Sequence, residues 1–224
     1  MARPSDVVDL GGVKELAGIK VEGNNVVVGG MTRHADVASS AEVKSAIPAL
    51  AYLAGHIGDP AVRNRGTIGG SIANNDPAAD YPGAVVALNA TITTNTRKIA
   101  ADDFFKGLFE TALAEGELVT SVSFPKVEKA AYMKFPNPAS RYAMVGVFVA
   151  KTASGVRVAV TGAGATVFRV KAMEDALSKN FSSAAIKDIK IPADGLNSDI
   201  HGSAEYRAHL VGVMARRAVD AANK

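Results

Sequence analysis

A run rich in small residues extends from Gly58 to Asp80 and contains four glycines, two prolines and three aspartates. Its centre, Thr67-Ile68-Gly69-Gly70-Ser71, combines two hydroxyl side chains with a glycine pair. Glycine lets backbone N–H groups approach a ligand closely, and successive exposed N–H groups form a concave anion site of the kind that holds phosphate. A tight turn that only joins two helices is equally compatible with these residue types. A phosphate-bearing cofactor is the first hypothesis for this segment.

Polar residues that follow the glycine pair extend the candidate site. Asp76-Pro77 is typical of an N-cap followed by the first residue of a helix, which we expect to reach Leu88. A helix N-terminus beside the glycine-rich loop would favour anions. Asp80 either accepts hydrogen bonds from sugar-type hydroxyls or complements the helix dipole. Asn74 either contacts the ligand or orients the loop.

The same run resembles the FAD-binding medium subunit of molybdenum hydroxylases, the family of aerobic carbon monoxide dehydrogenase and bacterial xanthine dehydrogenase. The resemblance is carried by Ala54-Gly55-His56-Ile57-Gly58-Asp59-Pro60, Thr67-Ile68-Gly69-Gly70 and Asp76-Pro77-Ala78-Ala79-Asp80, and it extends to Ser203-Ala204-Glu205-Tyr206-Arg207. A motif of this length is more specific than a single Gly-x-Gly-x-x-Gly. The resemblance implies that FAD is the cofactor.

The family's cofactor-binding residues can be carried over to matching positions of this chain. The resemblance implies that the 67–71 segment binds pyrophosphate or ribityl oxygens through its amides and hydroxyls, and that Asp80 binds sugar or ribityl hydroxyls. It implies that Lys134 reaches the edge of the flavin ring and that Tyr142 covers one face of the isoalloxazine. The complete set is Ile57, Thr67, Ile68, Gly69, Gly70, Ser71, Asn74, Asp80, Val119, Lys134 and Tyr142. No catalytic acid or base and no metal ligand is expected in this chain.

Structural interpretations of these residues stay open beside the functional ones. Lys134 alternates with apolar neighbours and could be a solvated strand lysine. Tyr142 could be a core or interface tyrosine, and Ile57 and Val119 could simply pack in a core. His56 lies beside the loop and could carry a proton, although a histidine at a helix end is the favoured interpretation.

Composition excludes several classes of function. The 224 residues include 25 basic and 22 acidic side chains, and a net charge of +3 is too small to indicate a nucleic-acid-binding protein. The absence of cysteine excludes disulfides, thiolate zinc sites and any iron–sulfur cluster held by this chain. No apolar stretch is long enough for a membrane span, and the first residues lack the apolar core of a signal peptide. We expect a cytoplasmic protein, with peripheral association at the inner face of the membrane as an alternative.

The alternation of strand and helix patterns predicts an α+β protein. Residues 18–30 read as a hairpin, Ser39-Ser40-Ala41-Glu42 as a capping box, and Pro48 as the possible start of a second helix. Further along, we expect strand, turn and strand over 91–100, a helix capped by Asp102-Asp103 that carries Phe104, Phe105, Leu108 and Phe109, and a strand over 117–124.

A short charged segment at 125–129 suggests a domain boundary. The interpretation is an N-terminally truncated FAD-binding domain of helices and short strands over residues 1–125, and a C-terminal domain over 130–224. The second domain should contain a three-stranded antiparallel meander followed by helices. We expect its strands at 131–135, 142–151 and 156–161, and its helices near 171–177, 182–189 and 203–222.

The resemblance breaks at the N-terminus. In the family, a first flavin loop rich in Ala-Gly-Gly lies on an N-terminal subdomain, ahead of the segment that corresponds to residues 3–10 here. We therefore expect the chain to lack that part of the FAD-binding domain and half of the pyrophosphate cradle. Since a buried phosphate needs its donors, the affinity for the flavin should fall.

The function implied by the resemblance is electron transfer. In the family, a large subunit with a molybdenum cofactor oxidises the substrate, and a small subunit with two 2Fe–2S clusters passes electrons to FAD in the medium subunit. The flavin then reduces an external acceptor such as a quinone or a nicotinamide. The expected assembly is a dimer of heterotrimers. The alternatives are a flavin-free scaffold remnant of such a subunit and, less favoured, a stand-alone flavin oxidase.

Overall fold

Short helices and strands alternate along the first half of the chain. The computed structural model describes residues 6–224. After a 3-10 turn at Lys14–Leu16, the elements are β1 (Ile19–Glu22), β2 (Asn25–Gly29), α1 (His34–Ser39), α2 (Ala41–Ala46), α3 (Pro48–Gly55), α4 (Pro60–Arg63), α5 (Ile68–Asn74), α6 (Tyr81–Ala87), β3 (Thr91–Thr94), β4 (Lys98–Ala100), α7 (Ala101–Phe104), β5 (Phe105–Gly107), β6 (Glu110–Thr111) and β7 (Val119–Pro125).

The second half has longer strands and ends in a long helix. Its elements are β8 (Lys129–Pro136), β9 (Ala143–Thr152), β10 (Gly155–Thr161), β11 (Phe168–Arg169), α8 (Lys171–Lys179), a 3-10 turn at Ser183–Ile186, and α9 (Ala204–Ala222). No helix within residues 6–224 has the length and apolar character needed to cross a membrane.

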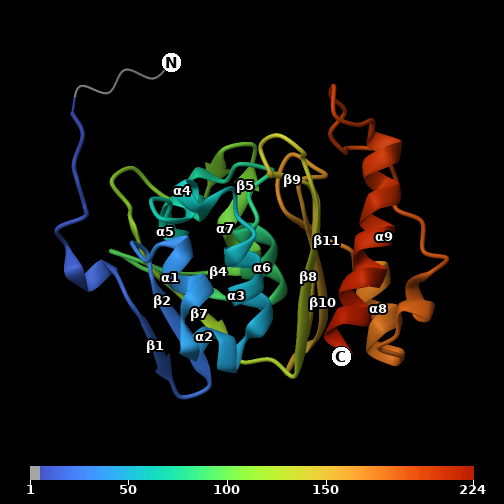
Figure 1. Cartoon of the computed structure of the whole chain (residues 1–224), viewed down its shortest axis with the longest axis horizontal. Coiled ribbons are helices and arrows are strands. Elements are labelled where there is room, and N and C mark those ends of the chain that lie inside the picture. The colour runs from blue at the N-terminus through green and yellow to red at the C-terminus, as the bar shows by residue number, and fades with distance from the viewer. Residues whose placement is uncertain (1–5) are drawn as a thin grey trace.

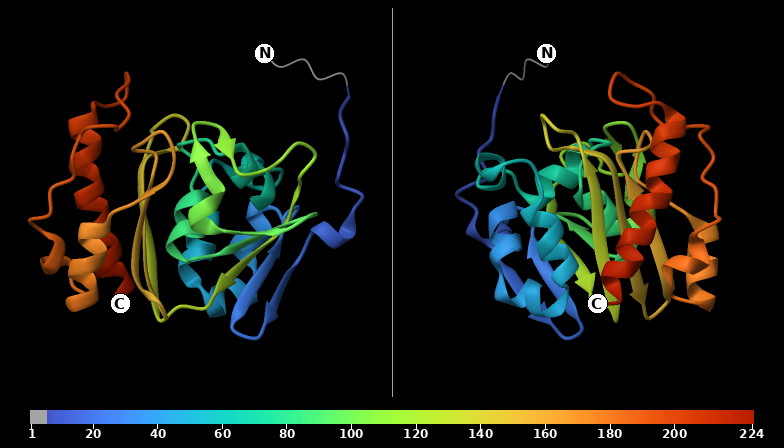
Figure 2. Two further views of the ribbon diagram at one scale, coloured as in Figure 1. Left: turned by 180° about the vertical axis from the view of Figure 1, so that it is seen from behind. Right: turned by 45° about the vertical axis from the view of Figure 1, so that its right-hand side comes forward.

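Two antiparallel sheets alternate with two helical layers across the molecule (Figure 1). The first sheet has the strand order β1-β2-β7-β3-β4, and the second has the order β11-β10-β9-β8. Helices α3 and α6 lie between the sheets, and α8 and α9 cover the outer face of the second sheet (Figure 2). The predicted α+β class is confirmed.

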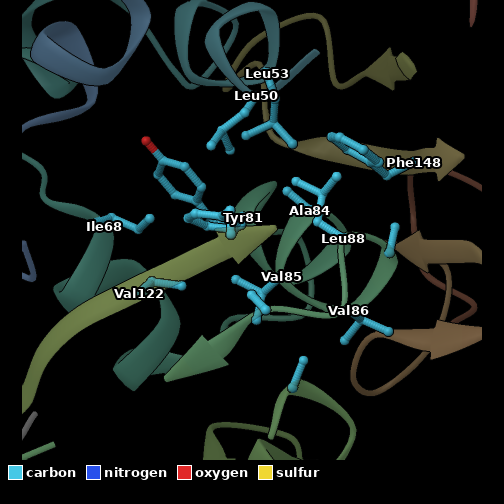
Figure 3. Close-up of a cluster of buried hydrophobic side chains, with 14 of the residues drawn as sticks. Leu50, Leu53, Ile68, Tyr81, Ala84, Val85, Val86, Leu88, Val122 and Phe148 are labelled. Carbon is cyan, nitrogen blue, oxygen red and sulfur yellow. The ribbon is translucent and has the colours of Figure 1, made fainter. Parts of the chain in front are cut away.

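The core between the two sheets joins both halves of the chain. Val28 and Val122 are paired in register on β2 and β7 and point into this core. Figure 3 shows Leu50 and Leu53 from α3 above residues of α6, with Phe148 of β9 on one side and Val122 on the other. Apolar alternation on the central strands therefore buries one face of each sheet against the same helices.

Strand β9 is buried on both faces. Phe148 and Ala150 belong to the core shared with the first half, whereas Val145, Val147 and Val149 belong to the core beneath α8 and α9. Because successive side chains of a strand point to opposite faces, a run with few polar residues suits a strand covered on both sides. The second sheet is thus the layer that joins the two halves.

Local sequence signals predicted much of this architecture correctly. The hairpin at 18–30, the second helix starting at Pro48 and the strand pair at 91–100 are present. The expected helix start is present but shifted by one residue: Ser40 is the N-cap and accepts from the N–H of Val43, whereas Glu42 accepts from the Ser40 hydroxyl, so the reciprocal bond of a capping box is not formed. The meander is confirmed and gains a fourth strand, β11.

Three local predictions are wrong. The helix expected from Pro77 begins only at Tyr81, because the Asp76 carboxylate accepts from the N–H of Ala78 and forms a turn instead of a cap. The helix expected over Phe104–Phe109 stops after one turn and continues as the hairpin β5–β6. The helix expected at 182–189 is only a 3-10 turn.

The proposed domain boundary falls between two strands. β7 ends at Pro125 and β8 begins at Lys129. Because the two halves share a buried core, the division into residues 1–125 and 130–224 stays a prediction.

Candidate functional site

A cavity of about 440 Å³ lies beside α5 and takes in residues from both halves of the chain. Seven predicted site residues line it: Ile57, Thr67, Gly70, Ser71, Asn74, Asp80 and Tyr142. Small-molecule sites commonly measure about 300–1,000 Å³. The structure therefore brings most of the predicted residues to one cavity of suitable size.

The segment predicted as a glycine-rich loop is the N-cap and first turn of α5. Thr67 has extended backbone geometry, and its hydroxyl accepts from the N–H of Gly70 at 3.3 Å. The N–H of Ser71 donates to the carbonyl of Thr67. Threonine is a favoured N-cap residue, which explains why α5 begins directly after Thr67. Thr67 and Ser71 line the cavity, and their hydroxyls can form hydrogen bonds with a ligand there.

Ile68 and Gly69 serve the packing of α5. Ile68 is fully buried, and its N–H donates to the carbonyl of Thr32. The N–H of Gly69 donates to the carbonyl of Gly30 at 2.8 Å, and a Cβ on Gly69 would lie 2.7 Å from that oxygen. Both backbone N–H groups already donate to protein carbonyls. Neither is therefore free to donate to a ligand in the way that the resemblance implied.

Asp80 occupies the position before α6, with its side chain 2% exposed. Its Oδ1 accepts from the Tyr132 hydroxyl at 2.5 Å and from Nζ of Lys134 at 2.9 Å. Burial raises the pKa of Asp80, while the charge of Lys134 and the Tyr132 hydrogen bond favour the ionised form. Within residues 6–224, no donor bonds Oδ2. Since Asp80 lines the cavity, Oδ2 is the acceptor left for a ligand.

Lys134 lies behind Asp80 rather than in solvent. Its side chain is 8% exposed, and Nζ donates to the carbonyl of His56 at 2.6 Å as well as to Asp80. It lines a second cavity of about 510 Å³, together with Tyr52 and Arg63. The interpretation as a solvated strand lysine therefore does not hold, and contact with a flavin edge stays a prediction.

Tyr132 was missed by the sequence analysis. It lies two residues before Lys134 on β8, so both side chains point to the same face. Its hydroxyl fits between the layers because residue 146 on β9 is glycine, and a Cβ there would overlap the hydroxyl. The two-residue spacing from Lys134 on the same strand was the one available sequence signal for Tyr132. Its partner Asp80 lies far away in the sequence, so the contact could not be predicted from the local pattern.

Two further cavity residues were also missed. Arg65 is exposed, lines the cavity and makes no ion pair with residues 6–224. A guanidinium two residues before Thr67 is a typical phosphate-binding group. His34 lines the same cavity from the start of α1 and is buried.

The remaining predicted residues have different surroundings. Tyr142 is 51% exposed beside the cavity, and Asn74 is exposed there as well. Val119 lies on β7 next to Gly30, outside the residues that line the cavity. The Nδ1 of His56 lies 2.7 Å from the carbonyl of Tyr52, which places this side chain at the end of α3 as the favoured interpretation expected.

The residues present fit a flavin nucleotide. The unbonded oxygen of Asp80 can accept hydrogen bonds from the hydroxyls of a ribityl or sugar chain, and the Arg65 guanidinium can bind a pyrophosphate. Tyr142 supplies an exposed aromatic surface. The donor set thus matches the charged, polyhydroxylated and aromatic parts of FAD.

Comparison with known proteins covers the whole chain. Residues 1–127 match the family described as FAD binding domain in molybdopterin dehydrogenase, and residues 130–222 match the CO dehydrogenase flavoprotein C-terminal domain. The nicotine 6-hydroxylase medium subunit of Paenarthrobacter nicotinovorans is 36% identical, over 98% of this chain and 82% of that protein. The carbon monoxide dehydrogenase medium chain of Hydrogenophaga pseudoflava is 34% identical, over 99% and 83%.

Solved structures agree with the sequence relatives. A Cu,Mo-CO dehydrogenase chain superposes with a TM-score of 0.88 and 31% identity, covering 99% of this chain and 83% of that chain. Quinoline 2-oxidoreductase from Pseudomonas putida 86 gives a TM-score of 0.87 and 28% identity, with 98% and 82% coverage. The chain belongs to the FAD-binding medium subunits of molybdenum hydroxylases, oxidoreductase subunits of the carbon monoxide and xanthine dehydrogenase type.

Proposed function

We propose that this chain binds FAD in the cavity beside α5 and passes electrons from iron–sulfur clusters of a partner subunit to an external acceptor. The observation that carries the proposal is the buried Asp80 carboxylate, which has two donors on Oδ1 and none from residues 6–224 on Oδ2. An ionised carboxylate with one oxygen unused beside a cavity is suited to accept ligand hydroxyls.

The proposed contacts divide among the parts of the cofactor. Asp80, Thr67 and Ser71 bind hydroxyls, Arg65 binds the pyrophosphate, and Tyr142 packs on an aromatic ring. Lys134 acts by holding Asp80 in place through the 2.9 Å ion pair. The bound flavin supplies the capacity to take up and release electrons, while the protein orients it.

We propose that the electrons come from another chain. This sequence has no cysteine, and no group of His, Asp and Glu within residues 6–224 is arranged to hold a metal ion. Relatives are named as the medium subunit or medium chain of larger enzymes. We propose a large molybdenum-cofactor subunit and a small iron–sulfur subunit as partners, in a dimer of heterotrimers. The proposed location is the cytoplasm, with peripheral association at the inner face of the membrane as the alternative.

The proposal is tested by visible absorption of the purified chain after incubation with FAD and removal of unbound cofactor. Retained flavin bands are expected, and Asp80→Asn should lose them because its amide cannot replace the charge. Asp103→Asn, an exposed residue of α7, is the matched control and should keep the bands. No bands in the unaltered chain would favour the flavin-free scaffold.

Electron transfer needs a second measurement on the assembled complex. The tagged chain should co-purify with large and small subunits expressed together with it, and added substrate should bleach the flavin bands. Bleaching without partner subunits would contradict the proposed route and favour a stand-alone flavin oxidase.

A further inference from the structure

Two buried polar atoms without a protein partner lie beside the cavity. His34 begins α1 and is 4% exposed, and Tyr81 begins α6 and is fully buried. Neither Nδ1 of His34 nor the Tyr81 hydroxyl has a hydrogen-bond partner in residues 6–224. Since buried polar groups nearly always have partners, this pair calls for an explanation.

The two rings are neighbours. Their centroids are 5.2 Å apart, with the planes tilted by 56°. Figure 3 shows the Tyr81 ring between Leu50 and Ile68, with the hydroxyl directed away from Val122.

The protonation states of the pair are complementary. Burial, with a smaller contribution from the charge of Arg63, lowers the pKa of His34 to about 4. Burial raises the pKa of Tyr81 far above its ordinary value. At neutral pH, Tyr81 therefore keeps a proton to donate, and the neutral imidazole keeps one nitrogen that accepts.

The opposite edge of the His34 ring lies at the cavity wall. The backbone N–H of His34 donates to the carbonyl of Gly66 at 3.0 Å, and both residues line the cavity. A Cβ on Gly66 would lie 2.5 Å from Nε2 of His34. Only glycine at position 66 therefore leaves room for the Nε2 edge beside this cavity-lining residue.

We propose that the Tyr81 hydroxyl donates to Nδ1 of His34 through one bridging water, and that Nε2–H of His34 donates to an acceptor oxygen of the bound cofactor. His34 is then a cofactor-binding residue, and Tyr81 is a positioning residue that fixes its tautomer. The cofactor half of this inference rests on the proposed function, since it takes FAD as the ligand.

The tautomer is tested without any cofactor, by ¹⁵N NMR of the histidine side chains in the whole chain. We expect His34 to carry its proton on Nε2 at neutral pH, and we expect Tyr81→Phe to shift the Nδ1 resonance of His34. The exposed His209 of α9 should be unaffected. A proton on Nδ1, or an unchanged Nδ1 resonance in Tyr81→Phe, would overturn this half.

The cofactor contact is tested by titrating FAD into the same proteins and following flavin fluorescence. His34→Leu should weaken binding about tenfold, the loss expected for one hydrogen bond to a bound ligand. His34→Gln, which keeps an amide N–H near the position of Nε2, should bind within about threefold of the unaltered chain. His209→Leu is the matched control and should bind normally.

The two failures are distinguishable. If the unaltered chain binds FAD and His34→Leu binds equally well, the contact is wrong and the proposed function stands. If the unaltered chain binds no FAD, the proposed function fails and the contact fails with it, while the NMR result still decides the His34–Tyr81 pair. Thermal unfolding of each variant shows whether a loss of binding reflects a loss of fold.

Discussion

The two halves of the chain meet at two acidic clusters that differ in burial and in the use of the carboxylate oxygens: the side chain of Asp80 is 2% exposed and that of Asp102 is 43% exposed. Asp80 is paired with Lys134 and Tyr132, and Asp102 is paired with Arg157 and Arg169. In both clusters, an acid of the first half accepts hydrogen bonds from side chains of the second. The Asp80 cluster uses one carboxylate oxygen only, whereas Asp102 uses Oδ1 with Arg157 and Oδ2 with Arg169.

The Asp102 cluster is closed on itself. Arg169 also bonds Glu174 at 2.7 Å, and Glu174 accepts from the N–H of Val158. Arg157 donates to the carbonyl of Val86 as well. Every strong acceptor there has a protein donor, as structural networks require. The comparison indicates that an ion pair between the halves can use both carboxylate oxygens, and that the unused oxygen of Asp80 is a feature of the cavity side.

Lys134→Met should give the largest effect, since it leaves Asp80 buried without its cation. The free energy of unfolding should fall by about 3 kcal/mol, and FAD binding should weaken more than about tenfold. Urea unfolding and FAD titration measure the two. Lys151→Met removes an exposed pair with Glu128 and should cost less than about 1 kcal/mol. A Lys134 variant as stable as this control would contradict the role of the cluster.

Arg157→Met should separate stability from binding. Arg157 is 7% exposed, and its loss leaves the Val86 carbonyl and Asp102 with fewer donors. Asp102 is 43% exposed and keeps Arg169, so the main loss is the donor to the Val86 carbonyl; we expect a loss of about 2 kcal/mol in unfolding free energy, while FAD affinity stays within about twofold. A fall in affinity comparable to that of Lys134→Met would remove the distinction between the two clusters.

Gly146→Ala should disturb the cavity-side cluster and the neighbouring Thr161 side chain, and leave the Asp102 cluster intact. The added Cβ would meet the Tyr132 hydroxyl and displace it from Asp80, at a cost of about 2 kcal/mol. Gly55→Ala, where the nearest contact of the Cβ would be 3.8 Å, should be neutral or slightly stabilising. Equal unfolding midpoints of the two variants in urea would show that Gly146 is not needed for the Tyr132 contact.

His34 should make the cavity side sensitive to pH. The pKa of His34 falls from 6.5 in the unfolded chain to about 4 in the folded chain. As the pH drops below 6.5, the unfolded chain therefore binds a proton that the folded chain does not, and the free energy of unfolding decreases. Between pH 6.5 and about pH 5, the loss should be about 1.5 kcal/mol. Glu117, whose pKa is lowered by hydrogen bonding to Arg97, has an ordinary value of 4.5 and contributes below that range.

The pH effect is assigned by variants. His34→Gln should flatten the dependence of unfolding free energy on pH over this range, and the exposed His209→Gln should leave it unchanged. A dependence that survives in His34→Gln would show that another group titrates.

Sequence alone predicted the elements whose signals are local. Ser40 and Ser203 cap helices through bonds to residues three positions on, and Pro48 starts a helix by its own ring geometry. The hairpin at 105–111 was missed because its carbonyls, at Gly107 and Glu110, are held by the amide of Asn75, more than thirty residues earlier.

The candidate site was predictable as a set of residues but not as a geometry. The Thr67–Ser71 motif indicated the cavity, and the resemblance indicated Asp80 and Lys134. The backbone N–H groups of Ile68 and Gly69 donate to the carbonyls of Thr32 and Gly30 and so cannot bind a ligand. No local sequence pattern predicts such bonds between distant segments. The Tyr132–Asp80 bond joins residues 52 positions apart, so it required the structure.

Strand β9 has a consequence for how such chains can be recombined. Its alternate side chains belong to two cores, with Phe148 packed toward the first half and Val147 toward α8 and α9. A chimaera that joined the first half of this chain to the second half of a relative would place the relative's counterpart of Phe148 against helices of this chain that pack on Phe148. Close-packed cores tolerate such mismatches poorly. Exchange of the halves between relatives would therefore succeed only if the inner face of β9 were transplanted with the first half.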